Sequence, residues 1–393
     1  MSRQSSVHAE VEGPVLTPSY RVLLAIAALG GVMMLWRFAA GLAAVSNLND
    51  GYPWGIWIAF DVVTGTALGC GGFAVALLVY ILNKGEYHPL VRPAILTSLL
   101  GYGLAVLAVT VDLGRFWELW KVPVYFWRWS HSPQLEVALC VAIYVLVLLI
   151  ELSPAFFEKW RRSPDSGLRS FAEKGLAFVK RYFVWILALG ILLPTMHQSS
   201  LGTMMLLTGP KLHPLWFTAW LPFLFLVNCI LMGYGVVVLE SHASASAFGR
   251  RRETEMLGRL SRVAMGTALF FVAFRLVDIV LRGQARALFS WFGVAVLVEL
   301  GLLVAGALVL MSEANRRSPS QQALAALLLV VGGTVYRFNV YLVGFRPGEN
   351  WSYFPAVPEL LITFGIVALE IALYVAAVKT FPILAGEPEP ARA

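Results

Sequence analysis

Residues 134–156, QLEVALCVAIYVLVLLIELSPAF, form the stretch that decides the fold of this chain. The stretch is apolar over most of its length, and its two acids, Glu136 and Glu151, lie toward its ends. About 20 consecutive apolar residues are needed to cross the hydrocarbon core of a bilayer. The stretch therefore predicts a transmembrane helix.

Nine further runs of similar character lie on either side of it. They cover residues 20–45, 56–82, 92–114, 174–194, 214–241, 257–282, 288–311, 321–344 and 357–380. The chain is 59% hydrophobic and 13% charged, whereas soluble proteins are about 25% charged. The sequence therefore predicts an all-α polytopic membrane protein of about ten transmembrane helices, with a membrane domain over residues 19–382 and tails at residues 1–18 and 383–393.

The basic residues indicate how these helices are oriented. Lys and Arg are retained in cytoplasmic loops, and the two segments richest in them, residues 159–181 and 250–262, fall on the same side as both termini. We therefore expect both termini in the cytoplasm and the chain in a bacterial inner membrane. The net charge of +7 does not indicate a nucleic-acid partner, because the basic residues form short clusters between apolar runs.

The cysteines and histidines argue against metal cofactors. Cys70, Cys140 and Cys229 each stand alone in an apolar run, without the close spacing that an iron-sulfur cluster or zinc site needs. Of the six histidines, only His197 lies in a membrane-embedded setting, whereas a haem held by two histidines needs both there. We expect no haem, iron-sulfur cluster or metal ion to be bound by this chain.

Six charged residues fall in the outer halves of the predicted helices, toward the periplasm. They are Arg37, Asp61, Asp112, Arg275, Asp278 and Arg337. A charge deep in a membrane helix costs at least about 2.5–3.5 kcal/mol, so each such residue is a candidate for function or for pairing. We expect these residues to form one polar layer that faces the periplasm.

Two pairs of charges have helical spacing. Asp112 and Arg115, like Arg275 and Asp278, are three residues apart and would share a helix face. A structural role, in which each pair only holds the helices together, explains this spacing as well as a functional role does. Glu299 lies nearer to mid-membrane, where a protonatable carboxyl group could serve a proton path.

Residues 193–202, LPTMHQSSLG, combine a proline, two serines and a glycine. This composition predicts a broken helix at Pro194, and broken backbone survives at membrane depth only where protein covers it or a cavity adjoins it. His197 would then lie at a polar pocket near the outer surface. A histidine can hydrogen-bond a quinone carbonyl group and exchange a proton near neutral pH, and a histidine that only caps the helix is the alternative.

Residues 47–60, NLNDGYPWGIWIAF, predict a short outer loop that leads directly into Asp61. Tryptophans at this depth ordinarily anchor a protein in the aromatic belt of the membrane. The loop lies on the same side as His197 and Asp112, so Trp54 is also a candidate for a binding site.

Several of these motifs, taken in order, resemble the NrfD and polysulfide-reductase-C family of membrane subunits. Within that family, the resemblance is strongest to the branch that serves the periplasmic uptake [NiFe] hydrogenase called hydrogenase-2. It covers about residues 47–382. The motifs that carry it are PWGIWIAFD (53–61), YHPLVRPAIL (87–96), VDLGRFW (111–117), LPTMHQSSLG (193–202), KLHPLW (211–216) and YFPAVPELLI (353–362).

The resemblance implies two four-helix bundles with a two-helix extension, and a pocket for menaquinone or ubiquinone near the periplasmic face. It also implies docking to a ferredoxin-like iron-sulfur subunit and to periplasmic catalytic subunits, here the large and small subunits of a [NiFe] hydrogenase. Together with the polar layer, it assigns quinone binding to His197, Gln198, Asp112, Arg115, Trp54, Asp61 and Arg37. The candidates for a coupled proton path are Arg275, Asp278 and Glu299.

Three other readings remain open. The chain could serve a different complex of the same family, with a multihaem cytochrome or a polysulfide or nitrite reductase. It could be a secondary transporter or proton channel, although such folds show interrupted helices in both halves and only one interruption, at Pro194, is expected here. It could also be a passive anchor without a quinone site.

Overall fold

The computed structural model describes residues 8–386, so the ends of the two expected tails, residues 1–7 and 387–393, lie outside the described residues. Within that range ten helical spans are long and apolar enough to cross a membrane, which confirms the expected all-α polytopic fold. Their bounds are Pro18–Ala40 (α1), Trp57–Ile81, Gly85–Asp112 with α4 (Val91–Asp112), Pro133–Trp160 (α6), Ser166–Leu206 (α7), Leu221–Phe248 (α8), Thr254–Leu281 (α9), Trp291–Met311 (α10), Pro319–Val343 with α12 (Pro319–Phe338), and Val357–Thr380 (α13).

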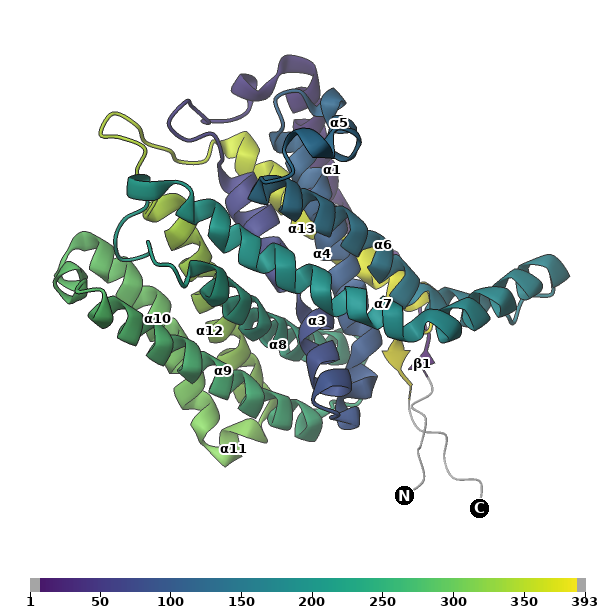
Figure 1. The fold of residues 1–393 in the computed structure, drawn as a ribbon. Coiled ribbons are helices and arrows are strands. Elements are labelled where there is room, and N and C mark those ends of the chain that lie inside the picture. The colour runs from purple at the N-terminus through teal and green to yellow at the C-terminus, as the bar shows by residue number, and fades with distance from the viewer. Residues whose placement is uncertain (1–7, 387–393) are drawn as a thin grey trace.

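Both ends of the described chain lie on the same side of the helices (Figure 1). There β1 (His8–Ala9) pairs antiparallel with β2 (Leu384–Ala385). We call this side the terminal face, and the opposite side, which holds the connections 41–56, 113–132 and 344–356, the distal face. An even number of crossings brings both ends to one side, as the sequence predicted.

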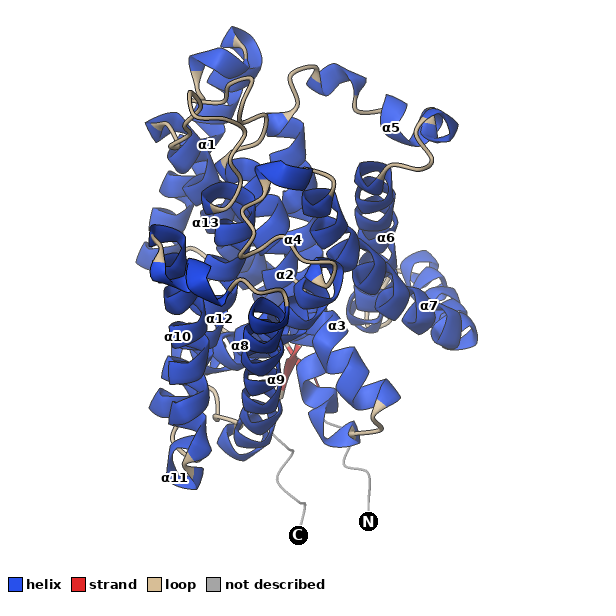
Figure 2. Cartoon of the chain, turned by 60° about the vertical axis from the view of Figure 1, so that its left-hand side comes forward, coloured by secondary structure: helices blue, strands red, loops and turns tan. Residues whose placement is uncertain are grey.

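The spans pack as two four-helix bundles and one helix pair. The first bundle contains the span Trp57–Ile81 with α4, α6 and α7, and the second contains α8, α9, α10 and α12. α1 packs along α13 as a two-helix extension beside α4. Nearly all of the described chain is helical (Figure 2). This grouping agrees with the arrangement that the family resemblance implied.

Helices approach most closely where glycines face neighbouring backbone. A Cβ atom added at Gly30 of α1 would lie only 2.6 Å from the Cα atom of Gly365 of α13. One added at Gly202 of α7 would lie 2.6 Å from the carbonyl oxygen of Leu221 in α8. Membrane helices associate through such close van der Waals packing, because burial of apolar surface gives little driving force in lipid. Small residues therefore join the extension and the two bundles.

The second span is not a regular α-helix. It begins as a π-helix (Trp57–Thr64), continues through α2 (Gly65–Leu68) and α3 (Gly71–Ala76), and ends as a second π-helix (Leu77–Ile81). π-Helical turns are frequent at functional sites because they redirect side chains that a regular helix would place elsewhere. The first of these segments carries Asp61.

The break that we expected at Pro194 is absent, and that prediction is wrong. α7 is continuous and contains Pro194 within it. A proline leaves one helix carbonyl group without its donor, here that of Gly190, four residues before Pro194, and membrane helices tolerate this because neighbouring groups compensate. The Thr195 hydroxyl group donates to the next carbonyl oxygen along the helix, that of Ile191, at 2.8 Å. Irregular backbone lies instead in the second span and in the π-helix Asn339–Val343 that ends the ninth.

The sixth span begins at Leu221, later than the expected start near residue 214. Residues 207–220 form a connection on the distal face, where Leu212 makes an isolated antiparallel bridge with Phe345. Trp216 in this connection is fully buried. The connection is apolar because it packs onto the helix ends, and for this reason its sequence resembles the start of a helix.

Candidate functional site

Arg37 lies at the distal end of α1 and binds the backbone on both sides of Asp112. Its guanidinium group is buried, and Nε and Nη2 donate to the carbonyl oxygens of Val111 and Leu113, each at 2.5 Å. The last carbonyl groups of a helix lack intrahelical donors and carry partial negative charge. Arg37 therefore caps the distal end of α4 and keeps a positive charge beside Asp112.

Asp112 is the last residue of α4, and its Oδ1 atom is shut off from solvent and has no hydrogen-bond partner among the described residues. The expected pairing with Arg115 is wrong. Leu113 has extended backbone (ψ 121°), so the helix ends before Arg115 can reach the same face, and Arg115 is exposed. In residues 8–386 the two side chains form no ion pair.

Asp61 lies on the second span, in its first π-helical segment. It is only 5% exposed and accepts a hydrogen bond of 2.8 Å from the Thr363 hydroxyl group of α13. We call Arg37, Asp61 and Asp112 the distal group. Each of these residues is next in sequence to a side chain that belongs to one apolar cluster or packs against it. That cluster includes Trp57, Val62, Leu104, Ala108, Val111, Ile362 and Ile366, with Phe38 and Phe60 packed against it. The distal group is thus set in apolar surroundings near one membrane surface.

His197 lies in a second group, between the two bundles. Its Nε2 atom is 2.5 Å from the Tyr102 hydroxyl oxygen, and its Nδ1 atom is buried and has no hydrogen-bond partner within residues 8–386. The neighbouring Gln198 donates to the Thr66 hydroxyl oxygen at 3.1 Å. Both His197 and Gln198 are fully buried, so the expected pocket near the outer surface is replaced by an enclosed hydrogen-bond network.

Arg337 of α12 completes this network, which we call the central group. Its guanidinium donates to Gln198 Oε1 at 2.9 Å, to Asn228 Oδ1 at 2.6 Å, and to the carbonyl oxygens of Val63 and Phe225 at 2.7 and 2.9 Å. No carboxylate in the described part of the chain lies within 4 Å of it. The central group therefore holds a buried cation through neutral acceptors alone.

A third group lies between α9 and α10. The expected pair of Arg275 and Asp278 is confirmed, with Nη1 and Oδ2 3.8 Å apart, and Arg275 Nη2 also lies 3.5 Å from Glu299 Oε1 of α10. The other carboxyl oxygen of Glu299 accepts hydrogen bonds from Asn339 and Trp216, at 2.7 and 3.2 Å. We call these residues the α9–α10 group. The single polar layer that we expected is thus three separate groups.

Trp54 belongs to none of the three groups. Its indole Nε1 donates to the carbonyl oxygen of Tyr341 at 3.1 Å, and its ring packs on Phe345 with centroids 4.5 Å apart. These contacts fix the distal connection 41–56 against the end of the ninth span. Its position favours a structural role over direct contact with the distal group.

Several neutral polar residues that complete the groups were not predicted from the sequence. They are Thr66, Tyr102, Trp216, Asn228, Asn339 and Thr363. Placing an uncharged polar side chain in a membrane helix costs less free energy than placing a charged one. Its presence in an apolar run is therefore weaker evidence for a functional site. Asn228, which stands inside the apolar run FLFLVNCILM, was the one with a detectable signal.

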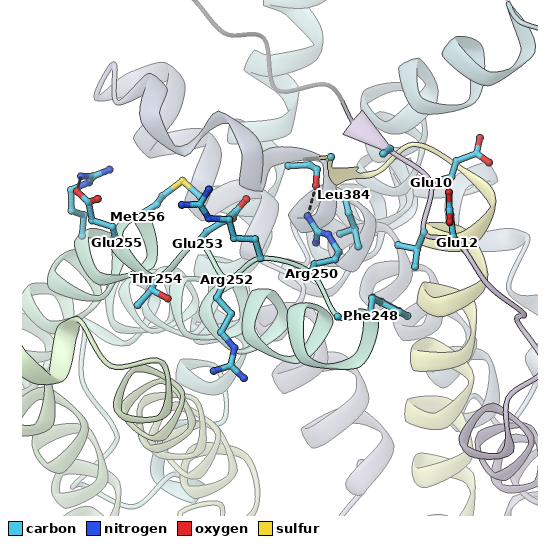
Figure 3. A pocket seen from close by; sticks show the side chains of 17 residues that line it. Glu10, Glu12, Phe248, Arg250, Arg252, Glu253, Thr254, Glu255, Met256 and Leu384 are labelled. Atoms are coloured by element: carbon cyan, nitrogen blue, oxygen red, sulfur yellow. Dashed lines mark hydrogen bonds and ion pairs between the residues drawn. The ribbon is translucent and has the colours of Figure 1, made fainter. Parts of the chain in front are cut away.

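A cleft of about 720 Å³ opens on the terminal face, between the loop that joins α8 to α9 and the paired strands (Figure 3). Arg250 points toward β2 and donates to the carbonyl oxygen of Ala385, whereas Arg252 points away from it. Burial raises the pKa of Glu253 in the same loop. Charges of both signs line the cleft without converging, and no residue predicted to bind quinone lies there.

Ten membrane-spanning helices with charged side chains gathered into buried groups define a multi-pass membrane protein. The chain belongs to the family described as polysulphide reductase, NrfD, whose model matches residues 44–346. The match begins in the first distal connection and ends after the ninth span, so it includes all three polar groups except for Arg37 and Thr363. Family membership confirms the resemblance that the ordered motifs predicted.

Three relatives resemble the chain over most of its length. It is 38% identical to the probable Ni/Fe-hydrogenase 2 b-type cytochrome subunit of Escherichia coli (strain K12), over 90% of this chain and 89% of that protein. It is 33% identical to a protein of Nitratidesulfovibrio vulgaris (strain Hildenborough), over 97% and 98% of the two chains. The menaquinone reductase integral membrane subunit of the same organism is 26% identical, over 91% and 90%. The first relative confirms the likeness to the hydrogenase-2 branch.

Proposed function

We propose that this chain is the quinone-reactive membrane subunit of a respiratory oxidoreductase whose soluble subunits lie on the periplasmic side of a bacterial inner membrane. It passes electrons between an iron-sulfur subunit and menaquinone or ubiquinone. A [NiFe] hydrogenase that oxidises H₂ is the preferred partner, because the similarity to the Escherichia coli hydrogenase 2 subunit extends over 90% of the chain. The similarity to a menaquinone reductase subunit supports the choice of quinone.

The observation that carries the proposal is the unpartnered Oδ1 atom of Asp112. A buried polar atom without a hydrogen-bond partner is costly, so it calls for a ligand or a water molecule to complete it. A quinone ring is apolar with two carbonyl oxygens, and it suits a site with apolar walls and a few convergent polar groups. The apolar cluster supplies such walls, and Arg37 and Asp112 supply two adjoining polar groups.

Within the distal group each residue has a distinct task. Asp112 would take up or release a proton, because Oδ1 is held by no other donor. Arg37 keeps a positive charge beside it and is itself held by two backbone carbonyl groups. Asp61, bonded to Thr363, would orient the ring from the second span. Bound quinone supplies the two-electron, two-proton chemistry.

His197 and Gln198 are the second candidate for quinone contact, through the matched HQSSLG motif. His197 Nε2 is occupied by Tyr102, which leaves Nδ1 as the atom free to bind a ligand. Because both residues are enclosed, a quinone would reach them only after local opening between the bundles. The distal group is therefore preferred, and variants in each group separate the two locations.

If quinone chemistry is coupled to proton translocation, the path is proposed through the α9–α10 group. In the part of the chain that the structure describes, Glu299 Oε1 and all three guanidinium nitrogens of Arg275 are buried without hydrogen-bond partners. Buried polar groups of this kind are commonly completed by internal water, and a chain of water molecules can carry protons. Asp278 lies at the distal end of this path, where Thr218 and Arg282 bind it.

Two other functions compete with this one. A different redox partner within the family is favoured by the similarity, at 23% identity over 57% of the chain, to a selenate reductase subunit of Mesobacillus selenatarsenatis. The other is a transporter. The number of interrupted helices does not distinguish a transporter from a redox subunit, because irregular backbone occurs in two spans other than the one with Pro194. Family membership now carries the preference for a redox subunit.

The test is electron transfer by the purified membrane complex to a soluble quinone analogue, with reduction of an artificial dye by the soluble partner as the internal control. The variants are Asp112→Asn, His197→Gln and, as a matched carboxyl-to-amide control, Glu349→Gln, whose side chain is exposed in the distal connection 344–356. We expect Asp112→Asn to lower the quinone rate about tenfold or more while the dye rate is retained, because loss of a proton-transfer group typically costs this much or more.

Each outcome separates the candidates. If His197→Gln abolishes the quinone rate and Asp112→Asn does not, the quinone site lies at the central group and the distal assignment is wrong. If both variants retain both rates, neither group binds the reacting quinone and the passive-anchor reading gains support. Loss of the dye rate in any variant indicates damage to the complex rather than to the quinone site.

A further inference from the structure

α7 is longer than a membrane crossing requires. It has 41 residues and so a length of about 60 Å, whereas the hydrocarbon core of a bilayer is about 30 Å thick. In Figure 1 the joined ends of α6 and α7 project sideways beyond the other helices, on the terminal face. The first part of α7 therefore stands away from both bundles, with α6 as its main packing partner.

The projecting part of this hairpin is strongly basic. Its exposed basic side chains, none of which forms an ion pair in the described part of the chain, are Arg161, Arg162, Arg169, Lys174, Lys180 and Arg181. Only two acids, Asp165 and Glu173, lie within residues 161–181, and Asp165 caps the start of α7. The net positive charge here is not neutralised by the protein itself.

Aromatic side chains follow one face of the same helix. Phe171, Phe178 and Tyr182 are spaced by seven and four residues, which places them on one stripe, and Phe171 is 58% exposed. Arg169 and Lys180 lie about half a turn away from this stripe by the same spacing rule. A third face packs on α6, where Gly175 lies against the Phe157 ring. The aromatic stripe adjoins the packed face, since the Phe171 ring also lies 5.8 Å from that of Phe157 in α6, and the basic face lies on the far side of the helix.

We propose that the α6–α7 hairpin, over residues 161–182, is a binding surface for anionic phospholipids of the leaflet at the terminal face. An amphipathic helix with aromatic residues on one face and Lys and Arg on another lies at the boundary between headgroups and acyl chains. Clusters of basic residues next to a membrane span attract anionic headgroups. The aromatic stripe enters that boundary, and the arginines and lysines bind the phosphate groups.

Charge complementarity favours lipid over a second copy of the chain. Two copies that met through this surface in a symmetric contact would bring the same basic residues against each other, and such like charges repel. Anionic headgroups, by contrast, carry the opposite charge and are attracted to these basic residues. The proposal concerns a region remote from the distal group and does not depend on the quinone assignment.

The test is retention of lipid by the purified full chain in mild detergent, counted by native mass spectrometry after titration with phosphatidylglycerol or with zwitterionic phosphatidylcholine. The hairpin variant carries Arg162→Gln, Arg169→Gln and Lys180→Gln. A matched variant carries Arg251→Gln, Arg252→Gln and Arg317→Gln, which removes three positive charges from the same face elsewhere. All six side chains are exposed, so both variants are expected to fold.

We expect wild type and the matched variant to prefer phosphatidylglycerol, and the hairpin variant to lose this preference by about fivefold or more, since each basic residue near an anionic surface contributes a factor of about that size. Raising the salt concentration to 1 M should weaken the preference in wild type, because the screening length falls to about 3 Å and the electrostatic attraction becomes short-ranged. An equal loss in both variants would show attraction by net charge alone and overturn the proposal. Unchanged lipid retention with loss of a dimer would assign the surface to self-association and overturn it as well.

Discussion

Arg337 of α12 donates a hydrogen bond of 2.9 Å to the side-chain oxygen of Gln198 of α7. This bond crosses from the second bundle to the first, and the same guanidinium reaches Asn228 of α8 and the carbonyl oxygen of Val63 in the second span. One buried cation therefore joins four helical spans. The acceptors of Arg337 are neutral. The contribution of Arg337 to joining the four spans can therefore be measured without a contribution from an ion pair.

Replacing Arg337 by methionine should destabilise the protein strongly. The change leaves the acceptors of Gln198, Asn228, Val63 and Phe225 without this donor, and each unsatisfied buried group costs about 1–3 kcal/mol. We expect the free energy of unfolding to fall by at least about 3 kcal/mol, measured by denaturant unfolding in mild detergent. An exposed control, Arg317→Met, should change it by less than about 1 kcal/mol, and an equal effect of the two changes would refute the assignment.

The ion pair of Arg275 and Glu299 predicts a compensating double variant. Arg275→Met leaves Glu299 buried without its positive partner, and breaking a buried pair in this way costs about 3–5 kcal/mol. Adding Glu299→Gln removes the uncompensated charge and should recover most of that loss. A double-mutant cycle of unfolding free energies measures the coupling. If the two effects simply add, the residues do not act as a pair.

The close contact of α1 with α13 predicts opposite behaviour of two adjacent glycines. Gly30→Ala places a methyl group against the backbone of Gly365, which should cost about 1–3 kcal/mol through strain or separation of the two helices. Gly31→Ala meets no atom within 4 Å and should be neutral or slightly stabilising, since alanine favours the helix. Thermal unfolding midpoints of the two variants give the comparison. Similar midpoints would mean that α1 is held elsewhere.

The pairing of β1 with β2 should depend on pH through His8. Burial, helped by the charge of Arg92, lowers the pKa of His8 to about 4, whereas the released segment should titrate near 6.5. Above pH 6.5 both forms are neutral and pairing is strongest. As the pH falls from 6.5 toward 4, only the released form gains a proton, so pairing weakens.

Amide hydrogen exchange in β1 and β2, corrected for the intrinsic pH dependence of exchange, measures this effect. Protection should fall between pH 6.5 and pH 5 in the wild type. His8→Gln removes the titrating group and should give protection that is constant over the same range. A decline of equal size in both proteins would trace the pH dependence to another residue.

The number of crossings and the placement of both ends on one side could be predicted from sequence, because they follow from length and hydropathy alone. The stretch at residues 134–156 became α6 almost as expected. The pairing of Arg275 with Asp278 was also predictable, since both residues lie on one continuous helix. Local rules succeed wherever the partners are close in the chain.

The same local rules failed where a helix end or a distant residue was decisive. Asp112 and Arg115 have helical spacing, but the helix ends between them. The segment around Pro194 has the composition of a break, but α7 continues through Pro194 as one helix. The second span has irregular backbone, but it contains no proline that would have predicted the irregularity.

The sequence by itself determined a ten-helix membrane protein, its family, and the residues that carry charge into the membrane, because each of these depends on composition or on short motifs. Only the tertiary structure decided how those charges are grouped. Arg37 caps a helix 74 residues away in sequence, and Arg337 reaches Val63 across 274 residues. Partners at such separations are brought together by the packing of whole helices. The spacing of residues along the chain does not predict which of them will meet.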